Sequence, residues 1–329
     1  AADVTPPEKL GDIDFEEITG GSTYTDSGKT VYTLGQNADG LTKDTLDLPT
    51  ALADGTPVTW TTSHEKSVFF FQGKAYILPQ SFDLICTITA KAGSSSKEYS
   101  LEINKPENYE PDYMVNENFD ALENGALPTG NTPLGTQIWK TDSTFDPAKG
   151  SIGASSENAY SGKSLKIVNS VAGKGAHALL HMKFNNNKER IIFDFKVNTI
   201  SGTGAAWAQS SSTSNGLGTD VIYRLQPKSG QMMISYGAGG DAADINKTFN
   251  VPSGWNEWKI IVDSEADFLM DLYHYNNRIA SNLLKRKGST AYSGVMLGMT
   301  QDQGGTILFD DIKVYADPAG AILKELGTI

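Results

Sequence analysis

Asp310 and Asp311 are adjacent carboxylates inside an otherwise apolar segment, residues 304–315. The segment is typical of a strand covered on both faces, and simple alternation divides its apolar side chains into two sets, Ile307 and Phe309 against Leu308, Ile312 and Val314. A carboxylate within a packed strand is costly unless a cation or strong donors contact it. We therefore expect Asp310 and Asp311 to meet a metal, a basic side chain or backbone N–H groups, and one of them to reach a bound calcium.

Several aromatic and polar side chains could bind a sugar, because pyranose rings are recognised by aromatic faces and planar polar groups. Trp207 lies in the loop-like stretch 202–209, which begins with Gly202-Thr203-Gly204, and Trp139 lies in the loop-like stretch 137–140, where a large ring has little core to join. Both are predicted sugar platforms, with a packing role as the alternative. Four residues on predicted strands complete the candidate set: Tyr223, Arg224, Tyr275 and His177, the last sharing a strand face with His181.

The same residue types leave an enzyme as an alternative. Jelly-roll polysaccharide lyases use His, Tyr, Arg, Gln or Asn on a concave sheet to neutralise a uronate carboxylate and to abstract the C5 proton. Their Arg-x-Glu-x-Arg and Gln-Ile-His strands do not occur in this sequence, nor does the Glu-x-Asp-x-x-Glu strand of jelly-roll glycosidases. Gly-x-Ser-x-Gly and His-Glu-x-x-His do not occur either. We therefore predict a protein without catalytic residues.

The composition indicates an all-β protein. The chain has 329 residues, enough for two domains, and 33 of them are glycine. Long stretches of helical apolar periodicity are missing. A net charge of −12 argues against binding to nucleic acid or to an anionic membrane, and the short basic run 285–287 is expected to be a solvated loop.

The single cysteine and the hydropathy suggest an exported protein. Cys86 alternates with apolar residues in a predicted strand, which favours a buried, inert thiol over a nucleophile. No apolar run approaches the roughly 18 to 20 residues that span a bilayer, so membrane insertion is not expected. The N-terminal residues resemble a mature start after a small-residue cleavage site or the edge of an excised fragment. Secretion or display at the cell surface is inferred from this.

Changes in the spacing of the predicted strands divide the chain into five segments. Residues 1–20 form an acidic, Pro-containing arm, and short strands with turns at 54–55 and 92–95 predict a small sandwich over 21–104. Residues 105–114 contain two prolines and are expected to be an extended linker. Longer alternating strands then predict two packed antiparallel sheets, a jelly roll, over 115–317. Residues 318–329 are a tail or the start of a further module.

The first sandwich resembles the bacterial immunoglobulin-like domains that connect modules of extracellular carbohydrate-active enzymes. The resemblance rests on Leu48-Pro49, on the stretch 54–63 with its Val58-Thr59-Trp60 strand, and on the strand 99–103. It implies that Trp60 lies in the core, and that the domain acts as a spacer or in adhesion and carries no catalytic residue.

Three pieces of the larger domain resemble β-sandwich carbohydrate-binding modules: residues 116–120, 159–167 and 308–315. Many of those modules hold a structural calcium where the first strand, the last strand and a Ser-Gly loop meet. Carried over to this sequence, the resemblance implies ligation by Asn118, Asp120, Ser161 or Lys163, and Asp311. Calcium accepts six to eight oxygens of these kinds. The family has Gly and Glu where this chain has Asn118 and Asp120, and pairing of Asp310 or Asp311 with Lys163, Lys166 or backbone N–H groups is the alternative.

The stretch 254–280 is similar to the laminin-G or concanavalin-like jelly roll. Trp258 alternates with Ile260 and is expected in the core, whereas Trp255 follows Gly254 and is expected at a rim.

Together these observations predict an immunoglobulin-like spacer followed by a larger jelly roll that binds a plant or microbial polysaccharide. The partners expected are that glycan and other modules of a longer chain. A surface-adhesion or structural protein without sugar binding, and a lyase or glycosidase, are the alternatives.

Overall fold

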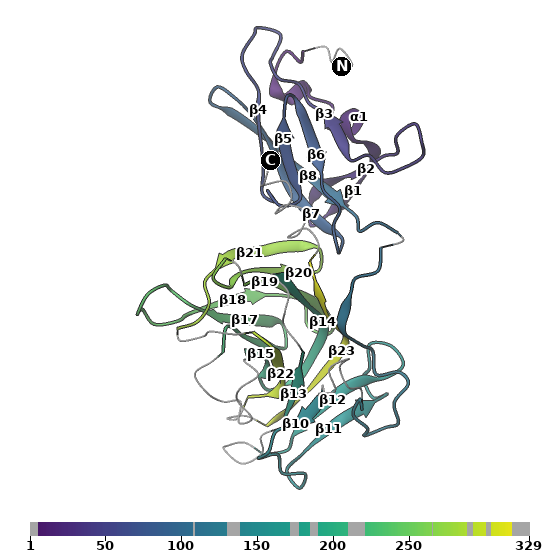
Figure 1. The fold of residues 1–329 in the computed structure, drawn as a ribbon, viewed down its shortest axis with the longest axis vertical. Helices are drawn as coiled ribbons and strands as arrows, with labels where there is room; N and C mark the ends of the chain where they lie inside the picture. Colours follow the sequence, from purple (N-terminus) through teal and green to yellow (C-terminus); the bar gives the residue numbers. More distant parts are fainter. Residues whose placement is uncertain are drawn as a thin grey trace. The chain divides into compact units, whose positions relative to one another are not determined.

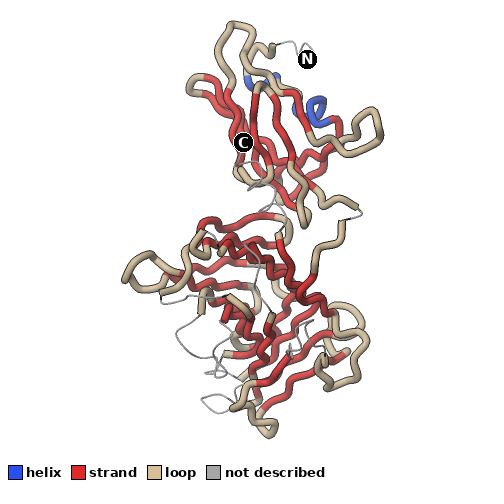
Figure 2. Tube along the Cα trace, in the orientation of Figure 1, coloured by secondary structure: helices blue, strands red, loops and turns tan. Residues whose placement is uncertain are grey.

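The computed structural model describes residues 6–107, 109–129, 139–171, 178–184, 190–209, 221–264, 266–287, 292–300 and 304–317. Strands dominate these residues and helix is scarce among them (Figure 1; Figure 2). The prediction of an all-β protein is confirmed. The chain divides into two compact units, one of Ala1–Pro111, Asn276–Arg278 and Asp317–Ile329, and one of Asp112–Tyr275 and Ile279–Ala316.

The first unit contains two small sheets packed on an aromatic cluster. Its elements are η1 (Leu10–Asp12), α1 (Phe15–Thr19), β1 (Gly20–Asp26), β2 (Lys29–Leu34), β3 (Thr45–Asp47), β4 (Thr59–Thr62), β5 (Val68–Phe71), β6 (Lys74–Ile77), β7 (Leu84–Ala92) and β8 (Ser95–Ile103). Strands β1-β2-β8-β7 form one sheet, with β4 against β7, and β3-β6-β5 form the other.

Aromatic stacking holds the centre of the first unit. Phe15 is buried and stacks on Tyr99, with the ring centroids 4.2 Å apart, and Trp60 lies 6.2 Å from the same tyrosine. Trp60 is half-buried, and its Nε1 donates to the Pro49 carbonyl at 2.9 Å. Cys86 is buried as predicted, and burial raises the pKa of its thiol to about 12. The thiolate that a nucleophile needs is therefore disfavoured.

The second unit is an antiparallel β-sandwich. The sheet that we call the β23 sheet has the order β21-β20-β19-β14-β23-β12-β11, with β9 also on β23, and the β22 sheet has the order β10-β13-β22-β15-β16-β17-β18. Their strands are β9 (Tyr113–Glu117), β10 (Trp139–Thr141), β11 (Gly150–Ser155), β12 (Ser164–Asn169), β13 (Leu179–Lys183), β14 (Arg190–Ser201), β15 (Gly204–Gln209), β16 (Arg224–Lys228), β17 (Gln231–Tyr236), β18 (Ile245–Asn250), β19 (Asn256–Asp263), β20 (Leu269–His274), β21 (Asn277–Leu283), β22 (Gly294–Met299) and β23 (Gly305–Ala316).

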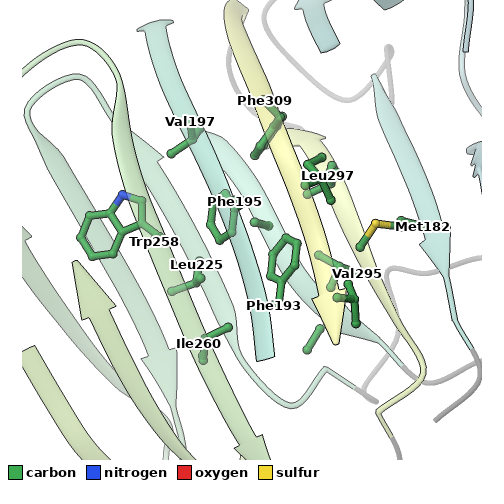
Figure 3. Packing of buried hydrophobic residues seen from close by; sticks show 14 of the residues in the cluster. Met182, Phe193, Phe195, Val197, Leu225, Trp258, Ile260, Val295, Leu297 and Phe309 are labelled. Atoms are coloured by element: carbon green, nitrogen blue, oxygen red, sulfur yellow. The ribbon is translucent and has the colours of Figure 1, made fainter. Parts of the chain in front are cut away.

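The core of this unit lies between its two sheets. Strands β14, β19 and β23 contribute Phe193, Phe195, Trp258 and Phe309, and strands β13, β16 and β22 meet them with Met182, Leu225, Val295 and Leu297 (Figure 3). Along each strand the core residues alternate with residues of the outer face, as the two-residue period of a strand requires. The prediction that Trp258 lies in the core is confirmed.

A β-bulge in β23 places Asp310 and Asp311. Asp194 pairs with Lys313 but Lys196 pairs with Asp310, so β23 holds one residue more than β14 over this interval. Asp311 absorbs the extra residue with a φ of 44°, a region that Asp tolerates better than most residues. The expected division of the strand into two apolar faces is therefore wrong, because the bulge brings Ile307, Phe309, Ile312 and Val314 all into the core.

We expect Phe195→Ala to lower the free energy of unfolding of the second unit by about 3–5 kcal/mol. Phe195 is fully buried and stacks on Phe193 at 4.5 Å, so its truncation leaves a cavity between the sheets. Urea unfolding followed by tryptophan fluorescence measures the change. Ile200→Thr is the matched control, because Ile200 lies on the same strand but is exposed, and a change within about 0.5 kcal/mol is expected there. Equal losses in both variants would contradict the assignment of Phe195 to the core.

Candidate functional site

The three segments predicted to surround a calcium lie close together. Strand β9 pairs with β23 and leads into Asp120, whose Oδ1 accepts a hydrogen bond from the Lys163 N–H at 2.8 Å. The Lys163 ammonium donates to the Asp120 carbonyl at 3.1 Å. Gly162 has a φ of +46°, and a Cβ at this position would lie 2.1 Å from the same carboxylate. Only glycine therefore allows the loop to close over Asp120, which explains the Ser-Gly motif.

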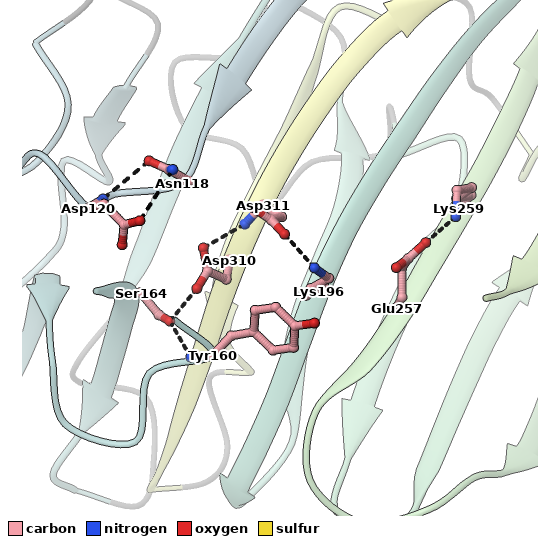
Figure 4. A network of polar contacts seen from close by, with 9 residues as sticks. All are labelled: Asn118, Asp120, Tyr160, Ser164, Lys196, Glu257, Lys259, Asp310 and Asp311. Carbon is pink, nitrogen blue, oxygen red and sulfur yellow. Dashed lines mark hydrogen bonds and ion pairs between the residues drawn. The ribbon is translucent and has the colours of Figure 1, made fainter. Parts of the chain in front are cut away.

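Asp310 is the carboxylate of β23 that faces this loop. Its Oδ2 accepts from Ser164 Oγ at 2.7 Å and its Oδ1 from the Asp311 N–H at 2.7 Å, and the Ser161 N–H is a further donor (Figure 4). The side chain is fully buried, and this burial raises the pKa of its carboxyl despite the donors. Asp310 thus closes the start of β12 onto β23.

Asp311 points to the other side and pairs with Lys196 on β14. Burial by itself would lower the pKa of Lys196, but the Asp311 carboxylate raises it. Asp120 is approached by the Asn118 amide at 3.4 Å. No group of three or more His, Cys, Asp or Glu side chains that could hold a metal occurs in the part of the chain that the structure describes. The protein's own donors thus contact the carboxylates that were expected to bind calcium, and Asp311 pairs with Lys196 while Asp120 contacts the Lys163 N–H.

Three aromatic rings gather beside this network and form what we call the aromatic rim: Tyr160, Trp255 and Tyr275. Tyr160 comes from the turn before β12, Trp255 from the turn before β19 and Tyr275 from the turn after β20. The centroids of Tyr160 and Trp255 are 5.6 Å apart with the rings at 70°, and Tyr275 Oη donates to the Trp255 carbonyl at 3.2 Å. Tyr160 and Tyr275 are 49% and 44% exposed, so their rings face solvent.

Hydrogen bonds and a cation fix the rings of the aromatic rim. Trp255 Nε1 donates to the Asn158 carbonyl at 3.3 Å, which ties the turn before β19 to the turn before β12. The Lys196 ammonium lies 3.8 Å from the centroid of Tyr160, a cation–π contact that orients this ring (Figure 4). Burial, followed by the charge of Glu257, raises the pKa of Tyr275. Glu257 therefore places a carboxylate near the rings.

A row of charged side chains continues this network along the outer face of the β23 sheet. Glu257 pairs with Lys259 on β19, and the register places Lys259 opposite Asp194 and Glu257 opposite Lys196. Burial raises the pKa of Asp194 to about 6, although the charges of three lysines act in the opposite direction. Tyr315 Oη donates to this carboxylate at 3.5 Å.

The predicted sugar-binding residues do not form one site. Trp207 lies on β15 and Trp139 on β10, so the prediction of loops at these positions is wrong. Trp139 is 3% exposed and packs edge-on against Phe119 in the core. Tyr223 is also in the core, where its Oη lies 3.1 Å from Tyr292 Oη and burial raises its pKa well above the ordinary value. Neither ring presents a face to a ligand.

Trp207 and Arg224 are cross-strand partners on the outer face of the β22 sheet, with the guanidinium carbon 4.5 Å from the centroid of the indole ring. Trp207 is only 9% exposed and belongs to a small apolar cluster of the outer face. Of the remaining candidates, Tyr275 is part of the aromatic rim, and His177 lies outside the described residues.

Sequence reasoning placed Trp255 at a rim but did not single out Tyr160 or Lys196. Tyr160 precedes the glycine turn of the Ser-Gly motif, a position where a large ring cannot join a strand. That position is the signal that could have identified it.

Comparison with known proteins gives no family. No family model matches the sequence, and no match was found among curated proteins. Solved structures with a similar fold include the carbohydrate esterase vb_24B_21 from the Shiga toxin-encoding bacteriophage phi24B, at 12% identity and a TM-score of 0.43 over 63% of this chain and 99% of the other. An endo-beta-1,4-glucuronan lyase from the fungus Trichoderma reesei is similar at 10% identity and a TM-score of 0.39, over 63% of this chain and 98% of the lyase. The T. cruzi calreticulin globular domain is similar at 14% identity and a TM-score of 0.41, over 65% of this chain and 94% of that domain.

Calcium at the meeting of the three segments stays a prediction, and thermal unfolding tests it. If an ion is bound there, added calcium raises the Tm of the wild type relative to EDTA, and Asp120→Ala removes the difference. Equal Tm values with calcium and with EDTA would contradict a calcium site. In that case the contacts among Asp120, Lys163, Asp310 and Ser164 stabilise this corner by themselves.

We expect Asp194→Asn to flatten the pH dependence of stability between about pH 4 and 6. The folded-state pKa of Asp194 is raised, so its contribution is present below the unfolded value of 3.8 and is lost as pH rises through about 6. The wild type should therefore lose roughly 1–3 kcal/mol relative to the variant from pH 4 to pH 7. Urea unfolding at each pH measures this. Asp241 is 97% exposed, so Asp241→Asn is the control and should show the pH dependence of the wild type. If Asp194→Asn shows that same dependence, Asp194 does not have a raised pKa in the folded state.

Proposed function

We propose that the second unit binds a polysaccharide through the aromatic rim and carries out no catalysis. The observation that carries this proposal is the meeting of three partly exposed rings from three separate turns at one place on the surface. Rings held in this way offer flat apolar faces to the C–H side of a pyranose ring.

The polar groups around the aromatic rim suit sugar hydroxyls. Glu257 is a planar carboxylate with acceptor capacity beyond its contact with Lys259, and Lys196 is a donor close to Tyr160. Backbone and cation contacts fix the rings before any ligand arrives, so little conformational entropy is lost on binding. Because an exposed rim binds the side of a chain rather than enclosing its end, a polymer is the ligand that we infer.

The arrangement of the chain supports a targeting role. The first unit has its own aromatic core and contributes no residue to the aromatic rim, in keeping with a spacer. The described residues contain no helix long and apolar enough to cross a membrane. We infer a secreted or surface-displayed protein whose binding unit holds other modules of the same chain against their glycan.

Affinity electrophoresis of the full chain through gels with xylan, β-glucan, mannan, pectin or alginate tests this function. We expect retardation in at least one gel and roughly tenfold weaker binding for Trp255→Ala, or about 1.4 kcal/mol, because the variant removes one ring and the edge-on partner of Tyr160. Tyr275→Phe keeps the ring but loses its hydrogen bond to the Trp255 carbonyl, so it should bind slightly less tightly than the wild type, whereas Tyr275→Ala should be weakened further.

Tyr24→Ala is the matched control, because Tyr24 is 40% exposed but lies on β1 of the other unit, and its mobility should equal that of the wild type. Uniform mobility of the wild type in every gel would contradict the proposal and favour a structural or adhesion protein. Absorbance from unsaturated uronates in the same mixtures would instead identify a lyase.

A further inference from the structure

A second set of polar side chains crosses the outer face of the β22 sheet in register. Strand pairing places one residue from each of six adjacent strands side by side, and we call this set the donor row. Its members, in order from β10 to β17, are Lys140, His181, Met296, Trp207, Arg224 and Ser235. Three members with polar atoms, His181, Trp207 and Ser235, are buried, although they lie on the face that is turned away from the core. Buried polar groups outside a core call for a partner.

Two neighbours in the donor row have buried polar atoms without a hydrogen bond. Among the described residues nothing accepts from Trp207 Nε1 or from Arg224 Nε. Such atoms are costly when buried and unpaired. Their adjacency in the sheet means that a single ligand could reach both.

The chemistry of these atoms defines what they can bind. An indole N–H and a guanidinium only donate, so their partner must be an acceptor. The guanidinium of Arg224 lies over the indole ring, a contact that engages its face and leaves the N–H groups along its edge available. Two parallel donors in a plane match the two oxygens of a carboxylate.

The described carboxylates beside the donor row, Asp244 near Arg224 and Asp142 at His181, are already paired. Asp244 accepts from Arg286 Nε at 2.7 Å, and its partner Arg286 is a second positive charge beside Arg224. Asp142 accepts from His181 Nε2 at 2.9 Å and from the Thr144 N–H at 2.8 Å. Burial alone would raise the pKa of Asp142, but these hydrogen bonds hold it below its ordinary value. Burial, followed by the charge of Arg286, lowers the pKa of Arg224, although the charge of Asp244 acts in the opposite direction.

We propose that Trp207 and Arg224 bind a carboxylate of an acidic saccharide, a uronic acid residue, at a site separate from the aromatic rim. That the ligand carries a carboxylate is inferred from the unpaired donors of Trp207 and Arg224. That the carboxylate belongs to a saccharide rests on the proposed function. The unit then has two binding surfaces, an aromatic one for ring faces beside the β23 sheet and a charged one for acid groups on the β22 sheet.

Matched polymers isolate the carboxylate. Polygalacturonate, alginate and glucuronan are compared with their methyl-esterified forms in affinity gels of the full chain. The wild type should bind at least one acidic polymer more than tenfold better than its ester, and added sodium chloride should weaken this binding. Arg224→Gln should abolish the preference, and Arg224→Lys should keep only part of it, because an ammonium has no fork for a carboxylate.

Two further variants distinguish loss of the carboxylate site from misfolding of the unit. Trp207→Phe keeps an apolar ring in place and removes the indole donor, so the preference should fall without a loss of Tm. Lys228→Gln removes an exposed cation from the same strand as Arg224 and should leave the preference unchanged. Retardation in any gel that detects the aromatic rim serves as the internal control of folding for the Arg224 variants.

The outcomes separate this inference from the proposed function. Binding of an acid polymer and its ester to the same extent, or an unchanged preference in Arg224→Gln, would overturn the carboxylate site and leave the aromatic rim standing. An acid preference that is unchanged in Trp255→Ala, together with no binding of any neutral polymer to the wild type, would support the donor row and contradict the aromatic rim. Release of the polymer by acetate as readily as by galacturonate oligomers would overturn the saccharide part of the proposal.

Discussion

The bulge in β23 is the constraint on which the second unit depends. It inserts one residue beside β14, and by doing so it keeps four apolar side chains in the core while two consecutive carboxylates are turned out of it. Asp310 then holds the start of β12 and Asp311 holds Lys196. Since Lys196 in turn lies over Tyr160, the position of a surface ring follows from a backbone irregularity in the central strand. A regular strand here would bury one carboxylate in the core or expose Ile312 and Val314.

The aromatic rim and the donor row differ in the exposure of their rings and in the hydrogen bonding of their polar groups. The aromatic rim has satisfied polar groups and open ring surfaces, whereas the donor row has covered rings and unsatisfied donors. Each sheet gives one face to the core and leaves the other free to vary, and the donor row lies on such an outer face. The rings of the aromatic rim come instead from turns at the ends of strands.

Strand alternation in the sequence was sufficient to predict the all-β fold, the core position of Trp258 and the burial of Cys86. It could not predict the bulge, since one inserted residue changes the phase without changing the composition. It also placed Trp207 and Trp139 in loops, because glycine and serine near an aromatic ring read as a turn while the pairing partners that make these strands are distant in the sequence. The gathering of Tyr160, Trp255 and Tyr275 depends on three turns whose approach only the tertiary fold determines.

The pairing of β9 with β23 has a mechanical consequence. Tyr113 lies opposite Tyr315, so the entry and exit of the second unit are at the same edge of one antiparallel pair. Tension applied along the chain pulls these two strands apart from that edge, and their hydrogen bonds, which run across the strands, are loaded one after another rather than all together. A unit connected in this way yields to force by unzipping. If it anchors a longer protein to a polymer, its resistance to shear flow is limited by this edge and not by the large apolar core behind it.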